Sequence, residues 1–199
     1  MTVRGGVGLG ELLRLSLADP RRAMRLILGL VLPPGTAMTA LALAAVLAAF
    51  AMHLLRLLLP GGRSGPSLLD MGGPISTALI QLGFLLLMAQ LVCWIGRMAG
   101  GRGGIQAALL AVAWLEVVML AVQLALIGVM LVLPGLAAVL MSLGVAVFLW
   151  LLTGFVAELH GFPSMRWVFL GIIATACAMI LILSILLAAL IGPEVLQNV

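Results

Sequence analysis

Residues 105–159 read IQAALLAVAWLEVVMLAVQLALIGVMLVLPGLAAVLMSLGVAVFLWLLTGFVAEL. Two long apolar runs are separated only by Pro134 and Gly135, and the ionisable side chains of the stretch are Glu116 and Glu158. Each run has at least the roughly 20 residues that an α-helix needs to cross a bilayer. Proline lacks a backbone N–H and clashes with the preceding turn, so it collects at helix ends. The stretch therefore predicts an antiparallel pair of membrane-spanning helices joined by a tight turn.

The same proline punctuation extends over the rest of the chain, where no proline interrupts a long apolar block. The sequence predicts an all-α polytopic membrane protein with five transmembrane helices, at about residues 37–59, 75–98, 105–133, 136–159 and 165–191. We expect three regions: a cytoplasmic, interfacial amphipathic segment at 1–34, a five-helix transmembrane domain at 35–192 and a short periplasmic tail at 193–199.

The composition supports a membrane protein and argues against other classes. Hydrophobic residues make up 65% of the chain and charged residues 8%, whereas a soluble domain carries about 25% charged residues to solvate its surface. A nucleic-acid partner would need a basic face with stacking aromatics, and aromatics are only 5%. We therefore expect the lipid bilayer, and no nucleic acid, as a partner.

The N-terminal stretch 8–32 has the pattern of an amphipathic helix. Asp19 followed by Pro20 predicts an N-cap with proline at the first helical position, so that a second helix restarts there. A helix with arginine on one face and leucine on the other tends to lie in the membrane interface. The alternative is a docking surface for a soluble partner. The polar stripe is formed by Glu11, Arg14, Ala18, Arg21 and Arg25, and the apolar residues away from it are Leu9, Leu12, Leu13, Leu17, Met24 and Ile27.

The arginines predict the orientation of the chain. With the N-terminus inside, eight of the ten arginines fall on the inner side, and only Arg56 and Arg63 fall outside. Because positively charged residues accumulate in cytoplasmic loops, we expect a cytoplasmic N-terminus and a periplasmic C-terminus. The inner arginines are Arg4, Arg14, Arg21, Arg22, Arg25, Arg97, Arg102 and Arg166.

Three segments, 12–25, 100–114 and 157–174, by their order and spacing along the chain, resemble segments of the Yip1 family of five-span membrane proteins. LLRLSLADPRRAMR (12–25) is similar to the family's apolar lead into an Asp-Pro-Arg step. GGRGGIQAALLAVAW (100–114) resembles the Gly-rich, basic entry to the third span, and AELHGFPSMRWVFLGIIA (157–174) resembles the turn between the fourth and fifth spans. The resemblance covers about residues 9–192.

The resemblance implies a compact bacterial-type membrane protein without a known catalytic motif. Glu116 departs from the family pattern, which has a small or aromatic polar run at this place. The acidic cytoplasmic domain of the eukaryotic members has no counterpart in the sequence, so their small-GTPase and trafficking connections are not expected here.

Glu116 is the candidate intramembrane polar site, with Gln123 two helical turns further on the same face. An ionised carboxylate near the bilayer midplane costs a few kcal/mol on insertion scales. One interpretation is a protonatable site that faces a cavity or a partner. The other is a protonated carboxyl that is hydrogen-bonded to a neighbouring helix and serves only to hold the helices together.

The remaining polar groups predict contacts with lipid or protein rather than chemistry. Gln90, Trp94 and Arg97 share one face, which indicates a headgroup or partner site or a snorkelling arginine with an interfacial tryptophan. The candidate headgroup or partner contacts are Arg14, Arg21, Arg22, Arg25, Arg97 and Arg102.

His53 falls near the outer end of the first predicted span and His160 near the inner end of the fourth, so their imidazoles would lie at different depths in the membrane. We therefore expect no haem or metal site. Cys93 and Cys177 are isolated within apolar blocks and are expected to pack as small hydrophobic residues. We expect Glu158, His160 and Arg166 to end one helix and start the next at the inner turn.

No hydrolase elbow, phosphate loop or HExxH motif occurs, so we expect neither an enzyme nor a cofactor. The leading interpretation is a bacterial inner-membrane scaffold or accessory subunit that acts through lateral protein and lipid contacts, with a membrane-protein partner or as a homo-oligomer. The alternative is a small transporter or proton-coupled permease that uses Glu116.

Overall fold

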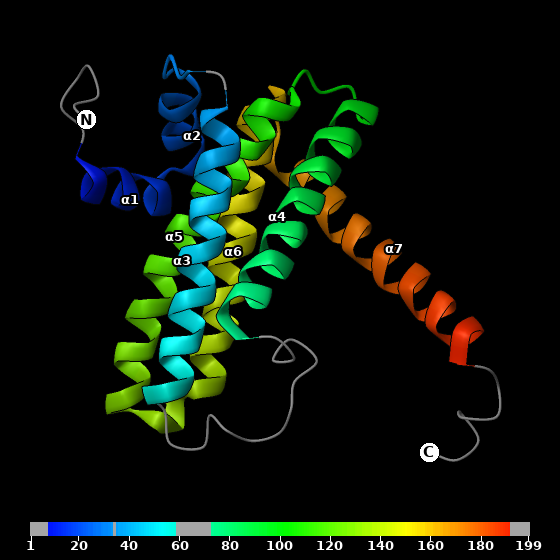
Figure 1. Ribbon diagram of the computed structural model, residues 1–199. Coiled ribbons are helices and arrows are strands. Elements are labelled where there is room, and N and C mark those ends of the chain that lie inside the picture. The colour runs from blue at the N-terminus through cyan, green and yellow to red at the C-terminus, as the bar shows by residue number, and fades with distance from the viewer. Residues whose placement is uncertain (1–7, 34, 59–72, 192–199) are drawn as a thin grey trace. The chain divides into compact units, whose positions relative to one another are not determined.

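The computed structural model describes residues 8–33, 35–58 and 73–191. Every regular element within these ranges is helical, in the order α1 (Leu9–Ala18), α2 (Pro20–Leu28), α3 (Thr36–Leu58), α4 (Gly73–Met98), α5 (Ile105–Val132), η2 (Pro134–Leu136), α6 (Ala137–His160) and α7 (Met165–Ile191) (Figure 1). Five of these helices are long and apolar enough to cross a membrane. The predicted all-α polytopic fold is confirmed, and the span boundaries agree within about two residues. The predictions for Arg4, Arg63 and the tail 193–199 lie outside the described residues.

Asp19 separates α1 from α2, as the sequence predicts. Its backbone is non-helical, and its side chain accepts a hydrogen bond of 3.0 Å from the backbone N–H of Arg22. Pro20, which has no N–H to donate, occupies the first position of α2. The chain therefore turns sharply at Asp19, and α1 lies crosswise to the bundle while α2 runs along it (Figure 1).

The chain divides into two compact units, Met1–Pro163 and Ser164–Val199. In the first unit, α3 packs against α4 and α5, α5 packs against α6, and α2 packs along α6. In the second unit, α7 is a single helix that is almost entirely apolar.

Buried side chains gather toward the end of the first unit where α6 terminates. In α6, every residue of the run 151–157 is buried, whereas Val139, Met141 and Val145 nearer its start are exposed. In α5, the buried positions likewise fall in its first half and end at Val118. The helices of the first unit are therefore packed most closely near this end, which also receives α2.

The close packing of α2 on α6 depends on Gly154. A Cβ atom at this position would lie closer than 3.0 Å to the ring of Pro20. Since the proline ring is rigid, it cannot move aside as a flexible side chain could. We expect Gly154→Ala to force α2 away from α6 and to lower the free energy of unfolding by about 1–3 kcal/mol, as over-packing does.

Gly144→Ala is the matched control on the same helix. The nearest atom to a Cβ there is Leu126 Cδ1 at 3.5 Å, an ordinary contact, and alanine is the better helix former. Thermal unfolding in detergent should show a lower Tm for Gly154→Ala and an equal or higher Tm for Gly144→Ala. Equal behaviour of the two variants would contradict the close contact.

Candidate functional site: a polar junction at one end of the bundle

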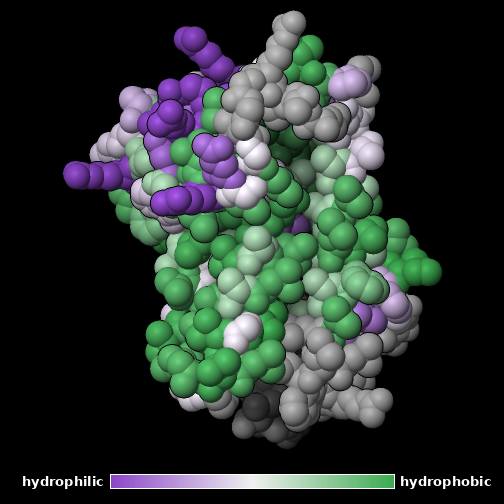
Figure 2. Space-filling model, turned by 90° about the vertical axis from the view of Figure 1, so that its left-hand side faces the viewer, coloured by the Kyte–Doolittle hydropathy of each residue, from purple (hydrophilic) through white to green (hydrophobic). Residues whose placement is uncertain are grey.

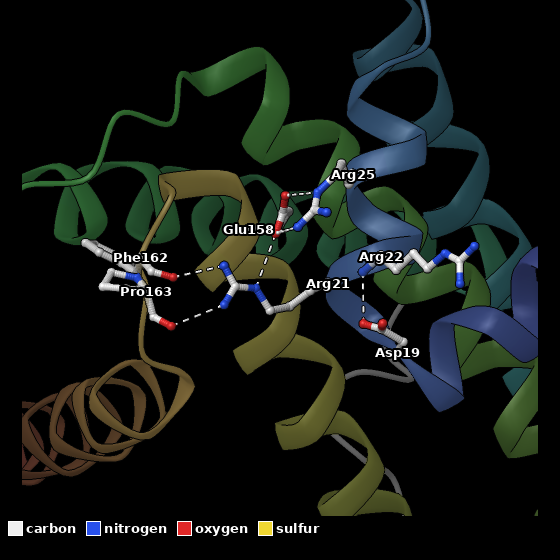
Figure 3. Close-up of polar contacts among 7 residues, drawn as sticks. All are labelled: Asp19, Arg21, Arg22, Arg25, Glu158, Phe162 and Pro163. Atoms are coloured by element: carbon white, nitrogen blue, oxygen red, sulfur yellow. Dashed lines mark hydrogen bonds and ion pairs between the residues drawn. The ribbon is translucent and has the colours of Figure 1, made fainter.

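The carboxylate of Glu158, near the end of α6, binds two arginines of α2 (Figure 3). Arg21 Nε lies 3.2 Å from Glu158 Oε2. Arg25 donates from Nε to Oε1 at 2.7 Å and from Nη2 to Oε2 at 3.1 Å. These charge-assisted bonds, one of them bidentate, fix α2 against α6 in both position and rotation.

Arg21 has a second set of partners beyond the end of α6. Its Nη2 donates to the carbonyl of Phe162 at 3.0 Å and its Nη1 to that of Pro163 at 3.4 Å. The last carbonyls of a helix have no intrahelical donor and need an outside partner. The Arg21 guanidinium supplies donors to the turn that follows α6.

The two arginines differ in exposure. The Arg21 side chain is 27% exposed and that of Arg25 is 68% exposed, against 14% for Glu158. The hydrogen bond that Arg25 donates to Glu158 raises the already high pKa of Arg25, so this guanidinium stays charged. Exposed ion pairs contribute little to stability, so the Arg21–Glu158 contact carries more structural weight than the Arg25–Glu158 contact.

His160, the last residue of α6, joins this helix to α4 and to the loop before α5. Its Nδ1 accepts a 3.1 Å hydrogen bond from the backbone N–H of Gly103, so the ring proton is assigned to Nε2. Nε2 lies 3.1 Å from the carbonyl of Val92, and the His160 carbonyl accepts from the N–H of Arg102. Both ring nitrogens are thus used in holding chain segments together.

Glycines make room for the imidazole. A Cβ atom at Gly96, Gly101 or Gly103 would lie closer than 3.0 Å to His160 ring atoms. The helix then ends at Gly161, whose φ of 72° is the left-handed conformation that glycine adopts freely. Gly101 and Gly103 of the glycine-rich stretch, with Gly96 of α4, therefore form a packing surface for one histidine. We call the Arg21–Arg25–Glu158 cluster together with His160 and its glycines the polar junction.

Two tryptophans attach α1 to the bundle. Trp114 of α5 donates from Nε1 to Ser16 Oγ at 2.9 Å, and Trp150 of α6 donates from Nε1 to the carbonyl of Leu17 at 3.1 Å. Ser16 is completely buried, whereas Leu9 and Leu17 are exposed. The contact of α1 with α5 is formed by the small Ser16, which belongs to neither the polar stripe nor the apolar set predicted for this helix.

Glu116 pairs with a residue that the sequence pattern did not select. Gln81 of α4 donates from Nε2 to Glu116 Oε1 at 2.9 Å. Gln123, predicted as its companion, is exposed. The structure therefore uses Glu116 in a hydrogen bond between α4 and α5.

The candidate headgroup contacts divide between α1, which carries Arg14, and the end of the first unit that holds the polar junction. The structure brings Arg21 and Arg25 together on Glu158. Figure 2 shows hydrophilic residues gathered over the α1–α2 end of the face it displays, with a hydrophobic band beyond them. The other candidates are exposed: Arg14, Arg22, Arg97 and Arg102.

Sequence reasoning did not predict the ion pairs of Glu158 with Arg21 and Arg25, nor the hydrogen bonds of the His160 ring with backbone groups. The predicted topology already placed Arg21, Arg25 and Glu158 on one side of the membrane, and this was a usable signal for an ion pair. In the part of the chain that the structure describes, no group of three or more His, Cys, Asp or Glu side chains is placed to hold a metal ion.

The helices define a polytopic α-helical membrane protein held together at one end by buried polar contacts. The Yip1 domain matches residues 14–186, so the chain belongs to the Yip1 family. The resemblance inferred from the three segments is confirmed. No curated protein and no solved structure gives a significant match.

We expect Glu158→Gln to weaken the polar junction. The change removes the charge that two arginines share, and hydrogen bonds to charged groups contribute about 1.5–3 kcal/mol each when they are not fully exposed. A double-mutant cycle with Arg21→Ala, read from thermal unfolding, should give a coupling energy above that of the cycle with Arg25→Ala. Glu11→Gln, at an exposed position of α1, is the control and should leave the Tm unchanged. Strictly additive effects of the Glu158 and Arg21 changes would contradict the proposed contact.

Adjacent glycines test the packing around His160. Gly103→Ala places a methyl group against the imidazole and disturbs the N–H that donates to Nδ1, so we expect a fall in Tm. Gly104→Ala meets nothing within 4 Å and should be tolerated. An equal loss in both variants would mean that the loop, rather than the histidine contact, determines the sensitivity.

Proposed function

We propose that this protein is a non-enzymatic integral membrane protein that acts as a scaffold or accessory subunit through lateral protein and lipid contacts. The supporting observation is how its polar side chains are used. Glu158 binds two arginines, both ring nitrogens of His160 face backbone groups, and Glu116 accepts from Gln81. These three side chains are thereby engaged in holding helices together.

The exposed surface of the spans is suited to lateral contacts. Large apolar side chains such as Phe50, Phe84 and Met141 are 65%, 63% and 73% exposed. A surface of this kind is stable only against lipid chains or another membrane protein. A protein whose surface is mostly lateral can act on its neighbours by occupying a face of a larger assembly.

We place the protein in a bacterial inner membrane with its N-terminus in the cytoplasm and its C-terminus in the periplasm. The distribution of arginines supports this orientation. The polar junction, the exposed Arg97 and Arg102, and the helices α1 and α2 would then all face the cytoplasm. The partner is a membrane protein or a second copy of the chain.

Native mass spectrometry after extraction in a mild detergent or in lipid nanodiscs tests the proposed function. We expect a stoichiometric complex with another membrane protein or a defined homo-oligomer. A lone monomer under conditions that preserve other inner-membrane complexes would contradict the proposal.

The variant Glu116→Gln separates this function from proton-coupled transport. Its amide oxygen can still accept from Gln81, so we expect the complex to be retained. The free energy of unfolding should change by no more than about 0.5 kcal/mol. Glu116→Leu removes the acceptor and should lower the Tm. Loss of a proton-coupled flux in liposomes with Glu116→Gln, at unchanged assembly, would favour the transporter and overturn the structural role of Glu116.

A further inference from the structure

The depth at which α1 meets the bundle is unexpected for an interfacial helix. Its attachment points, Trp114 and Trp150, lie about nine residues after the start of α5 and about ten residues before the end of α6. At 1.5 Å per residue, both indoles are about 14 Å from the polar junction, measured along the helices. Figure 1 shows α1 lying crosswise beside the bundle, well below the level at which α2 ends.

The side chains of α1 indicate that the membrane surface lies at this same depth. Glu11 and Arg14 are exposed, and burying either charge in the hydrocarbon centre costs a few kcal/mol. Leu9 and Leu17 are 65% and 43% exposed on the same short helix. A helix with exposed charges on one side and exposed leucines on the other lies along the boundary between headgroups and acyl chains.

From this geometry we propose that α1 lowers the membrane–water boundary along the α5–α6 face, so that the bilayer is locally thinned there and phospholipid headgroups rest on α1. Beyond Trp114, α5 continues to Val132, about 27 Å of helix, and α6 spans about 20 Å between Ala137 and Trp150. Both lengths are below the roughly 30 Å of an ordinary hydrocarbon core.

On the α5–α6 face, the region between α1 and the polar junction exposes charged side chains, which suit a polar environment. It is occupied by α2, which buries Ala23, Met24 and Ile27 against the bundle. The opposite side of α2 exposes Arg22 and Arg25. Together with Arg14 of α1, these guanidinium groups suit the phosphates of lipid headgroups, because the planar group donates to two phosphate oxygens at once.

The lowered boundary is confined to one side of the molecule. On α4, Phe84, Leu87 and Trp94 are 63%, 52% and 60% exposed, so apolar surface continues almost to the end of this helix at Met98. A bilayer that surrounds both faces must therefore be thinner beside α1 than beside α4. Such mismatch costs a fraction of a kcal/mol per Å and deforms the lipid rather than the helices. The inference does not depend on which partner the protein has.

Tryptophan depth in vesicles tests this proposal directly. The variant with Trp94, Trp114 and Trp167 replaced by Phe loses the bond between Trp114 and Ser16 but retains Trp150 and its bond to the Leu17 carbonyl of α1. It is reconstituted in phosphatidylcholine–phosphatidylglycerol vesicles whose lipids carry bromine at a shallow or a deep acyl position. We expect the shallow lipid to quench Trp150 at least about twofold more strongly than the deep lipid. If the whole of α6 lay inside the hydrocarbon, Trp150 would be near the midplane, and stronger quenching by the deep lipid would overturn the proposal.

A matched variant provides the opposite expectation. Met141→Trp in a background with all four native tryptophans changed to Phe places the indole about 13 Å further along α6, at a position 73% exposed. The proposal predicts that the deep lipid quenches this probe more strongly. If instead the polar junction lay at the membrane surface, the deep lipid would quench Trp150 more strongly and the shallow lipid would quench the probe at position 141 more strongly.

A nitroxide on α1 provides a second measurement that keeps all four tryptophans. Arg14→Cys is combined with Cys93→Ala and Cys177→Ala, and the label's collisions with a water-soluble nickel chelate and with oxygen are compared. We expect nickel accessibility typical of the headgroup region. Accessibility to oxygen alone would place α1 in the hydrocarbon and overturn the proposal.

Discussion

The shared carboxylate of Glu158 determines how α1 and α2 sit on the bundle. It binds Arg21 and Arg25 of α2 at the same time, and Arg21 continues to the carbonyls of Phe162 and Pro163. This fixes the rotation of α2, whose Pro20 then meets Gly154 closely. Because Asp19 ends α1 immediately before Pro20, the position of α2 also sets the depth of α1. One ion cluster thus fixes the packing of α2 and, through Asp19, the position of α1 on the bundle, on which the proposed depth of α1 in the membrane rests.

His160 imposes the complementary constraint from the other side of α6. A polar ring in a largely apolar bundle is stable only when its nitrogens are paired, and here the backbone of the α4–α5 loop and of α4 supplies the partners. Side chains cannot approach that closely, so the surrounding positions are glycines. Dense packing near this end follows from these polar contacts, since helices in lipid gain little from apolar burial alone.

Hydropathy and proline spacing predicted the spans, the α1–α2 break and the Asp19 cap, because each depends on local sequence. They could not predict which residues meet between helices. The spans are apolar on every side, so periodicity does not show how each helix is rotated. For this reason the sequence selects Gln123, on the same face of α5, together with Glu116, but does not identify Gln81 of α4 as the hydrogen-bond partner of Glu116. Ser16 was overlooked on α1 for a related reason: its burial comes from an indole that belongs to α5.

The three segments that carry the resemblance to the Yip1 family contact one another within the first unit, which holds residues 157–163 of the third segment. Residues 12–25 supply the arginines and Ser16, residues 100–114 supply the glycines and Trp114, and residues 157–174 begin with Glu158 and His160. Each segment was weak evidence alone, yet each contributes a partner to a contact with another. In this chain the three segments therefore share the packing contacts that build the helical architecture of the first unit. This supports the proposed role, in which the protein contacts lipid and neighbouring membrane proteins through surfaces whose depth in the membrane and whose charge are fixed.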